Sequence, residues 1–145
     1  MPLIESYRYS RANIRSHPDW LFAFGDNLEE SGYGGQAREA RGEPNAVGIV
    51  TKRAPSMAEA AFLEDTDLPS ISFRWRMAFT RLNAHLMAGG TVIWPSDGIG
   101  TGRAQLATRA PALWRELQIY IAGMRAVSDA APYLRPAKRD EPGKA

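Results

Sequence analysis

Short apolar runs along this chain alternate with longer segments in which apolar residues recur every three or four positions. The continuous runs cover residues 20–24, 46–51 and 91–95. Runs of this length and continuity are typical of strands that are covered on both faces of a sheet. Residues 3–8 form a further, weaker apolar segment. The pattern therefore predicts three buried strands and one edge strand.

The clearest helix prediction lies between the runs at 46–51 and 91–95. Its apolar residues are spaced by four, three, four and four positions, which forms one stripe along a helix. The stripe consists of Ile71, Trp75, Ala78, Leu82 and Leu86. Ser70 is positioned to cap the start of this helix, and Gly89 and Gly90 follow where C′ glycines end one. Trp75 is expected in the core.

A second helical stripe follows the last apolar run. It consists of Leu106, Ala110, Leu113, Leu117 and Ile121. Pro111 lies inside this pattern, so we expect either a kink or a helix that begins near it. Trp114 is expected in the core. Shorter helices are predicted over residues 35–41 and from Ser56, where Glu59 completes a capping-box pattern.

The order of these elements predicts the fold class. Strands that alternate with helices favour an α/β layered fold with a mostly parallel or mixed central sheet. A chain of 145 residues can bury a sizeable core as a single domain. We expect this domain to span residues 1–126. Residues 127–145 hold three prolines, a glycine and scattered charges, a composition that predicts a disordered tail.

Composition narrows the possible functions. The absence of cysteine excludes disulfides, thiolate nucleophiles and zinc–cysteine sites, and it fits a reducing compartment. No export signal and no apolar run of about 20 residues is found, so we expect a cytoplasmic protein without a membrane partner. Lys and Arg number 18 against 16 Asp and Glu, a surplus that suits a small anionic ligand and is too weak to argue for nucleic acid. His17 and His85 lack metal-ligand spacing.

Two glycine-rich loops carry the strongest functional signal. They cover residues 25–37 and 96–103, and each lies between a predicted strand and a predicted helix. This arrangement turns backbone N–H groups and a helix N-terminus toward one point, which suits a phosphate. Two such loops could hold the two phosphates of a dinucleotide-like ligand. The alternative is that the glycines are ordinary turn residues.

Lys52 and Asp97 are the candidate catalytic residues. Lys52 directly follows a predicted strand and therefore lies at the same sheet edge as the glycine loops. It could neutralise a phosphate, attack an electrophilic sugar carbon as a desolvated amine, or lie in water. Asp97 opens the second loop, where it could act as a general base on water or form a turn.

The candidate ligand contacts lie in both loops. Asp26 or Asn27 could contact a ribose or an adenine edge, although such side chains also form local Asx turns. Tyr33 could stack on a base or ribose, or act as a lid. Arginines flank the loops, and each could pair with a phosphate. They are Arg38, Arg41, Arg53 and Arg103. The remaining candidates are Gly34, Gly35, Gln36, Ile99, Gly100, Thr101 and Gly102.

These residues together resemble a macrodomain, specifically the branch of terminal ADP-ribose–protein glycohydrolases and related short phage and bacterial proteins. The matching segments are residues 24–27 with 34–37, residues 49–54, and residues 94–95 with 99–102. They follow the order of the family's FGxN strand, GxGxxA loop, (I/V)TK(K/R) strand end and P-x-IG-x-G-L loop. The similarity covers roughly residues 20 to 120.

The resemblance implies a ligand and a mechanism. In that family the two loops embrace the diphosphate and distal ribose of ADP-ribose, and the lysine that corresponds to Lys52 forms a lysyl–ribose adduct. The chain departs from the family in two places. Residues 103–105 are Arg, Ala and Gln where the glycohydrolases carry an acidic residue, so Asp97 would have to replace it. No final strand is evident after the last helix.

We therefore expect a protein that binds ADP-ribose or a related adenine nucleotide, with no cofactor. It would act as an ADP-ribosyl glycohydrolase on a modified protein or nucleic acid, or as a binding module or sponge without turnover. A third hypothesis is a nucleic-acid or assembly protein whose loops contact phosphates generically. A steep salt dependence of binding would favour the third hypothesis. A bulky residue at Gly34 or Gly100 is expected to weaken binding and leave the fold intact.

Overall fold

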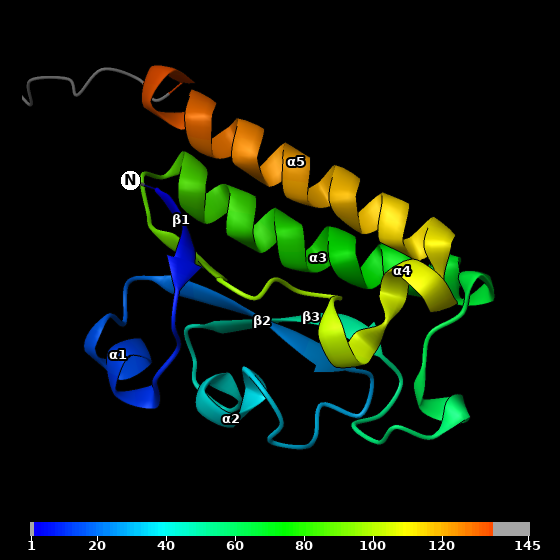
Figure 1. Cartoon of the computed structure of the whole chain (residues 1–145). Coiled ribbons are helices and arrows are strands. Elements are labelled where there is room, and N and C mark those ends of the chain that lie inside the picture. Colours follow the sequence, from blue (N-terminus) through cyan, green and yellow to red (C-terminus); the bar gives the residue numbers. More distant parts are fainter. Residues whose placement is uncertain (1, 135–145) are drawn as a thin grey trace, which may run out of the picture.

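A computed structural model describes residues 2–134 of the chain. Its centre is a four-stranded sheet, which runs through the middle of Figure 1. The strands are β1 (Leu3–Tyr7), β2 (Leu21–Asn27), β3 (Ala46–Lys52) and β4 (Val92–Pro95). Their order is β1-β4-β2-β3 and every pair is parallel. The prediction of an α/β fold is confirmed, with a sheet that is parallel throughout.

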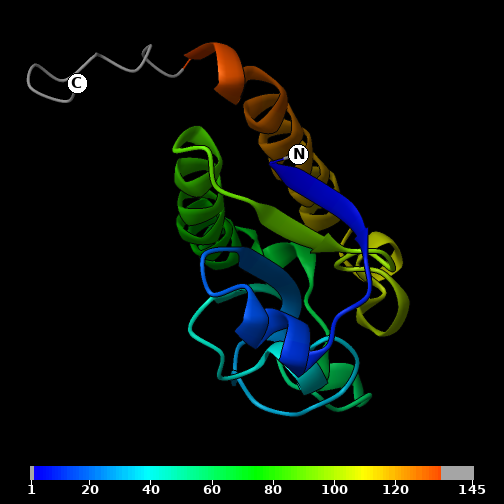
Figure 2. The same cartoon turned by 90° about the vertical axis from the view of Figure 1, so that its left-hand side faces the viewer.

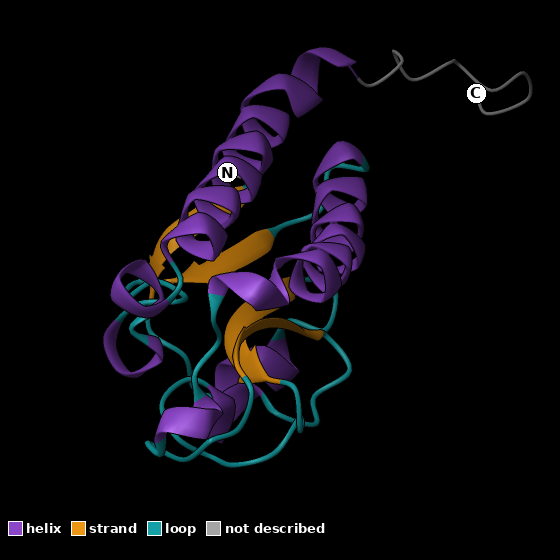
Figure 3. Ribbon diagram, turned by 90° about the vertical axis from the view of Figure 1, so that its right-hand side faces the viewer, coloured by secondary structure: helices purple, strands orange, loops and turns teal. Residues whose placement is uncertain are grey.

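Helices cover both faces of this sheet. The short helices α1 (Arg11–Ser16) and α2 (Ala37–Ala40) lie on one face, and the long helices α3 (Leu68–Met87) and α5 (Pro111–Leu134) lie on the other (Figures 1 and 2). Figure 3 shows the same division from the opposite side. Each face has its own apolar cluster, and the larger one lies under α3 and α5.

Helix α3 has the buried stripe that the sequence predicts, except at one position. Phe79 is buried in the place assigned to Ala78, which is only half-buried. The predicted cap at Ser70 is wrong, because the helix begins at Leu68 with Asp67 as its N-cap residue, and the Ser70 hydroxyl donates to the Asp67 carbonyl. The predicted end is confirmed, since Gly89 follows the helix with a φ of +88°.

Helix α5 is longer than predicted. A short helix, α4 (Leu106–Arg109), precedes it, and α5 begins at Pro111, where proline is tolerated in the first turn. It continues to Leu134 and buries Ser128 and Ala131. The domain boundary at residue 126 and the tail prediction are therefore wrong for residues 127–134. Residues 135–145 of the predicted tail lie outside the described residues.

The segment between β3 and α3 also differs from the prediction. The capping box at Ser56 is wrong, since the helical turn that follows is a 3₁₀ helix, η1 (Glu59–Ala61), whose N-cap residue is Ala58. The Ser56 hydroxyl instead accepts a hydrogen bond from the Ala58 N–H. The actual capping box joins Glu64 and Asp67 around the next 3₁₀ turn. No helix within residues 2–134 is both long and apolar enough to cross a bilayer.

Candidate functional site

The connections that leave β2 and β4 diverge to opposite faces of the sheet. From β2 the chain passes through α2 to β3, whereas from β4 it passes through α4 to α5. The two strands pair only at Leu21–Val92 and Phe22–Ile93. Where they part, the Tyr9 hydroxyl lies within hydrogen-bond distance of both the Ala23 carbonyl and the Ile93 carbonyl, which share its one hydrogen. Such a switch in topology leaves a crevice at the carboxyl ends of the strands.

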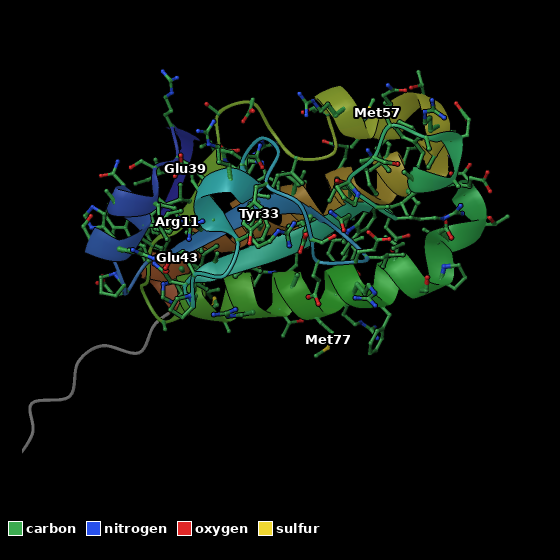
Figure 4. All side chains as sticks on the ribbon, turned by 90° about the horizontal axis from the view of Figure 1, so that it is seen from below. Arg11, Tyr33, Glu39, Glu43, Met57 and Met77 are labelled. Atoms are coloured by element: carbon green, nitrogen blue, oxygen red, sulfur yellow. The ribbon has the colours of Figure 1, made fainter. Side chains whose placement is uncertain are left out.

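A cavity of about 610 Å³ occupies this crevice. Its walls are the loops that follow β2, β3 and β4, as expected for parallel strands whose carboxyl ends share one edge. The predicted site residues that line it are Asp26, Asn27, Gly34, Gly35, Gln36, Lys52, Asp97, Ile99, Gly100, Thr101, Gly102 and Arg103. Tyr33 is outside this lining and 66% exposed, and Figure 4 shows it beside α2.

The loop after β4 offers a row of backbone donors. Gly98, Gly100 and Gly102 adopt φ values of +78°, +84° and +53°, which other residues rarely adopt. The Gly98 N–H donates to the Pro95 carbonyl and the Ala104 N–H to the Thr101 carbonyl. Between them, none of the N–H groups of residues 99–103 donates to another described residue. Five consecutive donors therefore remain available at the cavity wall.

Gly100 also has a structural role. A Cβ there would lie 3.1 Å from Leu117 and 3.2 Å from Leu106, both in the core. A bulky residue at Gly100 is therefore expected to disturb the packing of α5 as well as binding, so it does not test the cavity alone. At Gly34 a Cβ would meet only the flexible end of Arg103, at 3.4 Å from its Nη1. Gly34 is therefore the position at which to test the cavity.

Gln36 holds the two glycine loops together. Its Oε1 accepts a hydrogen bond from the Gly25 N–H at 2.9 Å. Its Nε2 donates to Asp97 Oδ1 at 3.0 Å and to the Gly98 carbonyl at 2.8 Å. Since one amide oxygen and both amide hydrogens are used, Gln36 positions the loops and the Asp97 carboxylate. Asp97 keeps its second oxygen for other contacts.

Asp26 and Asn27 stabilise the first loop. Asp26 Oδ1 accepts from Arg41 Nη2 at 2.7 Å, in an ion pair whose side chains are almost entirely buried. Arg41 also donates to the carbonyls of Gly32 and Ser31. Asn27 Oδ1 accepts from the Glu29 N–H, which is the Asx turn that the sequence allowed. Both residues therefore shape the cavity from within the loop.

Lys52 is a buried cation at the end of β3. Only 8% of the residue is exposed. Its Nζ donates to the Ser56 carbonyl, lies 3.6 Å from Met57 Sδ and is 4.7 Å from the centre of the Phe62 ring. No carboxylate of the described residues lies within 4.0 Å of it. Burial lowers the pKa of Lys52, and the positive charges of Arg103 and Arg109 lower it further.

Some of the other arginines form ion pairs with carboxylates, and others do not. Arg53 is paired with Asp67 at 2.7 Å, and Arg109 makes a two-pronged pair with Glu59 above the Phe62 ring. Arg38 is exposed and is not part of the cavity lining. Arg103 lines the cavity and forms no ion pair with a described residue. Of the charged lining residues, Asp26 and Arg41 neutralise each other, and Lys52 and Arg103 outnumber the remaining carboxylate, Asp97. The cavity therefore carries a net positive charge, which favours an anionic ligand.

Several lining residues, and the role of one candidate residue, were not predicted from the sequence. Arg41 was predicted to pair with a phosphate but pairs with Asp26, which lies fifteen positions away, and the sequence shows no local signal for this pair. Thr51 and Pro55 flank Lys52 and could have been found from their position at the strand end. The remaining unpredicted lining residues are Gly25, Ser31, Gly32, Ala37, Gly98 and Ala104.

The aromatic and histidine predictions have mixed outcomes. Trp75 is fully buried, and Trp114 is partly buried against the core. His17 stacks on Trp20 with ring centres 3.8 Å apart, and His85 packs against Gly90. Within residues 2–134, no group of three or more His, Cys, Asp or Glu side chains is arranged to hold a metal ion.

Comparison with known proteins gives a family and no function. No curated protein matches the chain, and no solved structure does. One family model matches residues 4–119, which include β2, β3, β4, all of β1 except Leu3, and every residue that lines the cavity. That model describes a family of unknown function, DUF7831, and the chain belongs to it.

Proposed function

We propose that the cavity binds ADP-ribose or a related adenine nucleotide, with the diphosphate between the two glycine loops. One observation carries the proposal. A single cavity is lined by five residues whose backbone N–H groups have no acceptor among the described residues, and by Lys52 and Arg103, which have no carboxylate partner among them. Backbone donors and cations that converge in this way are how proteins commonly bind phosphate groups.

Size and charge support a small ligand over a nucleic acid. The cavity volume of about 610 Å³ lies within the usual range for small-molecule sites. The cations lie inside a concave site, whereas a nucleic-acid surface needs a stripe or patch of basic residues. The surplus of two positive charges over the whole chain is small for such a surface.

Lys52 favours a second candidate function, in which the site removes ADP-ribose from a modified macromolecule. Because its pKa is lowered by burial, a larger fraction of Lys52 is a neutral amine at neutral pH than of an exposed lysine. The amine would attack the anomeric carbon of the distal ribose, and the modified carboxylate would leave. Asp97, whose orientation is fixed by Gln36, would serve as base when water resolves the adduct.

Calorimetric titration with ADP-ribose, AMP and NAD tests the binding proposal. We expect a micromolar dissociation constant for ADP-ribose, equivalent to about −8 kcal/mol. Gly34→Val should weaken binding about tenfold or more, because its side chain holds the phosphate and Arg103 away from the loop. Gly123→Val is the matched control, since a Cβ there meets no atom within 4 Å. Binding that is unchanged in Gly34→Val would remove these loops as the site.

Release of ADP-ribose from a modified carboxylate tests the catalytic proposal. We expect weak turnover by the native chain, with loss of turnover in Lys52→Ala. Borohydride should trap an adduct on the native chain and none on that variant, whereas Asp97→Ala should form the adduct and resolve it slowly. Turnover that survives Lys52→Ala would exclude the lysine mechanism. Binding without turnover or adduct would leave a binding module, and binding that falls steeply with salt would favour the nucleic-acid hypothesis.

A further inference from the structure

The cavity wall is built of backbone and charged groups, with few apolar side chains. Among the described residues that line it, the apolar ones are Ala37, Pro55, Ile99 and Ala104. The remainder are glycines and polar or charged residues. A nucleobase is usually held by an aromatic or guanidinium plane on which it stacks, together with hydrogen bonds to its edges. No aromatic side chain of the described residues lines this cavity, and of its two guanidinium groups Arg41 is bound to Asp26 and Arg103 is assigned to the phosphates. The lining of this cavity is suited to phosphates and hydroxyls instead.

Neither Tyr33 nor Tyr9 is among the residues that line the cavity. Tyr33 is 66% exposed and outside the lining. Tyr9 does not line this cavity; it lines an adjoining one of about 440 Å³, which shares Gly35, Gln36 and Asp97 with the first. The Tyr9 ring packs edge-on against Phe22 at 5.5 Å, and its hydroxyl is anchored between β2 and β4.

The polar side chains of the cavity match the sugar part of a nucleotide. Thr51 presents a hydroxyl whose only hydrogen bond within residues 2–134 is a long one, 3.5 Å, to the Asp26 carbonyl. Asp97 has a carboxylate oxygen that Gln36 does not use. A hydroxyl and a carboxylate oxygen are suitable partners for the hydroxyls of a ribose. Lys52, Arg103 and the N–H groups of residues 99–103 suit its phosphates.

We propose that this cavity recognises the phosphates and the ribose of its ligand and leaves the base outside. The inference rests on the proposed function and defines its ligand class as nucleoside diphosphate riboses with any base. Stacking of a base on an aromatic ring contributes about five- to 150-fold in affinity. Without that contribution, exchange of one base for another changes the affinity little.

Titration with a series of ligands tests the inference. The series consists of ADP-ribose, its hypoxanthine and cytosine analogues, ribose 5-phosphate and adenosine. We expect the two analogues to bind within about threefold of ADP-ribose, since no ring stacks on their bases. Ribose 5-phosphate should bind measurably and adenosine should not, because the phosphate carries the charge that Lys52 and Arg103 meet.

Two variants locate the contacts. Arg103→Ala should weaken all the phosphorylated ligands by the same factor, because its guanidinium meets a group that they share. Tyr33→Ala should leave the affinity of every ligand unchanged, because Tyr33 lies outside the lining. Circular dichroism and thermal melting confirm that both variants are folded.

The titrations distinguish a failure of this inference from a failure of the proposed function. If ADP-ribose binds and either analogue is weaker by about thirtyfold or more, the base is recognised and this inference is wrong, while the proposed function stands. A loss in Tyr33→Ala that is confined to the adenine ligand has the same meaning and identifies Tyr33 as the stacking ring. If no phosphorylated ligand binds, the proposed function fails, and the inference fails with it.

Discussion

Arg41 and Lys52 line the same cavity, and they differ in their partners. The Arg41 side chain is 11% exposed and is neutralised by Asp26 at 2.7 Å, with further hydrogen bonds to two carbonyls of its own loop. Only 8% of Lys52 is exposed, and within residues 2–134 the contacts of its amine are with a carbonyl, a thioether and the face of a ring. The first cation holds a loop in shape, and the second is left without a counterion.

This difference distinguishes a charged residue that stabilises the fold from one that is a candidate for function. A buried ion pair is retained when both partners are satisfied, whereas a buried cation without a carboxylate destabilises the fold. The cluster around Glu43, which Figure 4 labels with Arg11 and Glu39, follows the first pattern, since Arg11 and Arg15 both bond the Glu43 carboxylate. Lys52 follows the second pattern. A group that weakens its own fold is a candidate for a function that requires its charge or its amine.

Removal of the Asp26 carboxylate, the partner of Arg41, should have the largest effect on stability. Asp26→Ala leaves Arg41 buried beside Gly32 and Ser31 without a counterion. We expect a loss of about 3–5 kcal/mol in the free energy of unfolding, measured by urea denaturation. Asp19→Ala, at an exposed carboxylate, is the matched control and should change the stability by less than about 0.5 kcal/mol. Equal stability of the two variants would show that the Asp26–Arg41 pair does not hold the loop.

Removal of the Lys52 cation should lower the affinity for the ligand. Lys52→Ala is expected to weaken the binding of ADP-ribose by about 1–3 kcal/mol, the usual size of a charged contact. Arg53→Ala is the control, because the neighbouring guanidinium is already bound to Asp67 at 2.7 Å and is absent from the cavity lining. Calorimetry compares the two variants. An equal loss in both would mean that general charge, and not Lys52, attracts the ligand.

The part of the site that the sequence predicts is the part fixed by topology. Apolar runs followed by glycines at residues 25 and 98 predict parallel strands and loops, and parallel strands bring those loops to one edge. The position of Lys52 directly after β3 follows from the same argument. Thirteen of the sixteen residues predicted as catalytic residues, ligand contacts or phosphate partners therefore line one cavity, all but Tyr33, Arg38 and Arg53, although the sequence contains no information about their distances.

The roles of individual side chains were harder to predict, because they depend on partners distant in sequence. Gln36 was expected to contact the ligand, yet its amide is used by Gly25, Asp97 and Gly98. The end of α5 shows the same limit. Residues 127–134 have the composition of a tail, but a helix already packed against the sheet extends through them and buries Ser128. Local composition does not contain this contribution from tertiary packing.

Replacement of the unpaired cation by an uncharged side chain should stabilise the fold. Lys52→Met keeps most of the side-chain volume and removes the buried charge, so we expect a gain on the order of 1 kcal/mol in the free energy of unfolding at pH 7. Arg38→Met, at an exposed cation, should change the stability by less than about 0.5 kcal/mol. A stability loss in Lys52→Met would mean that the contacts of Lys52 with Ser56 and Phe62 outweigh the cost of its burial.

The smallest expected effect is the pH dependence of that gain. The pKa of Lys52 is lowered in the folded state from its ordinary value of 10.5, mainly by burial, so the unfolded chain holds this proton more tightly than the folded chain. The resulting destabilisation is complete below the folded pKa and declines as the pH rises from that pKa toward 10.5. The native chain should therefore approach the stability of Lys52→Met between pH 7 and pH 10. Urea denaturation of both proteins across this range measures the difference. A constant difference would show that volume or packing, and not the charge of Lys52, distinguishes the two proteins.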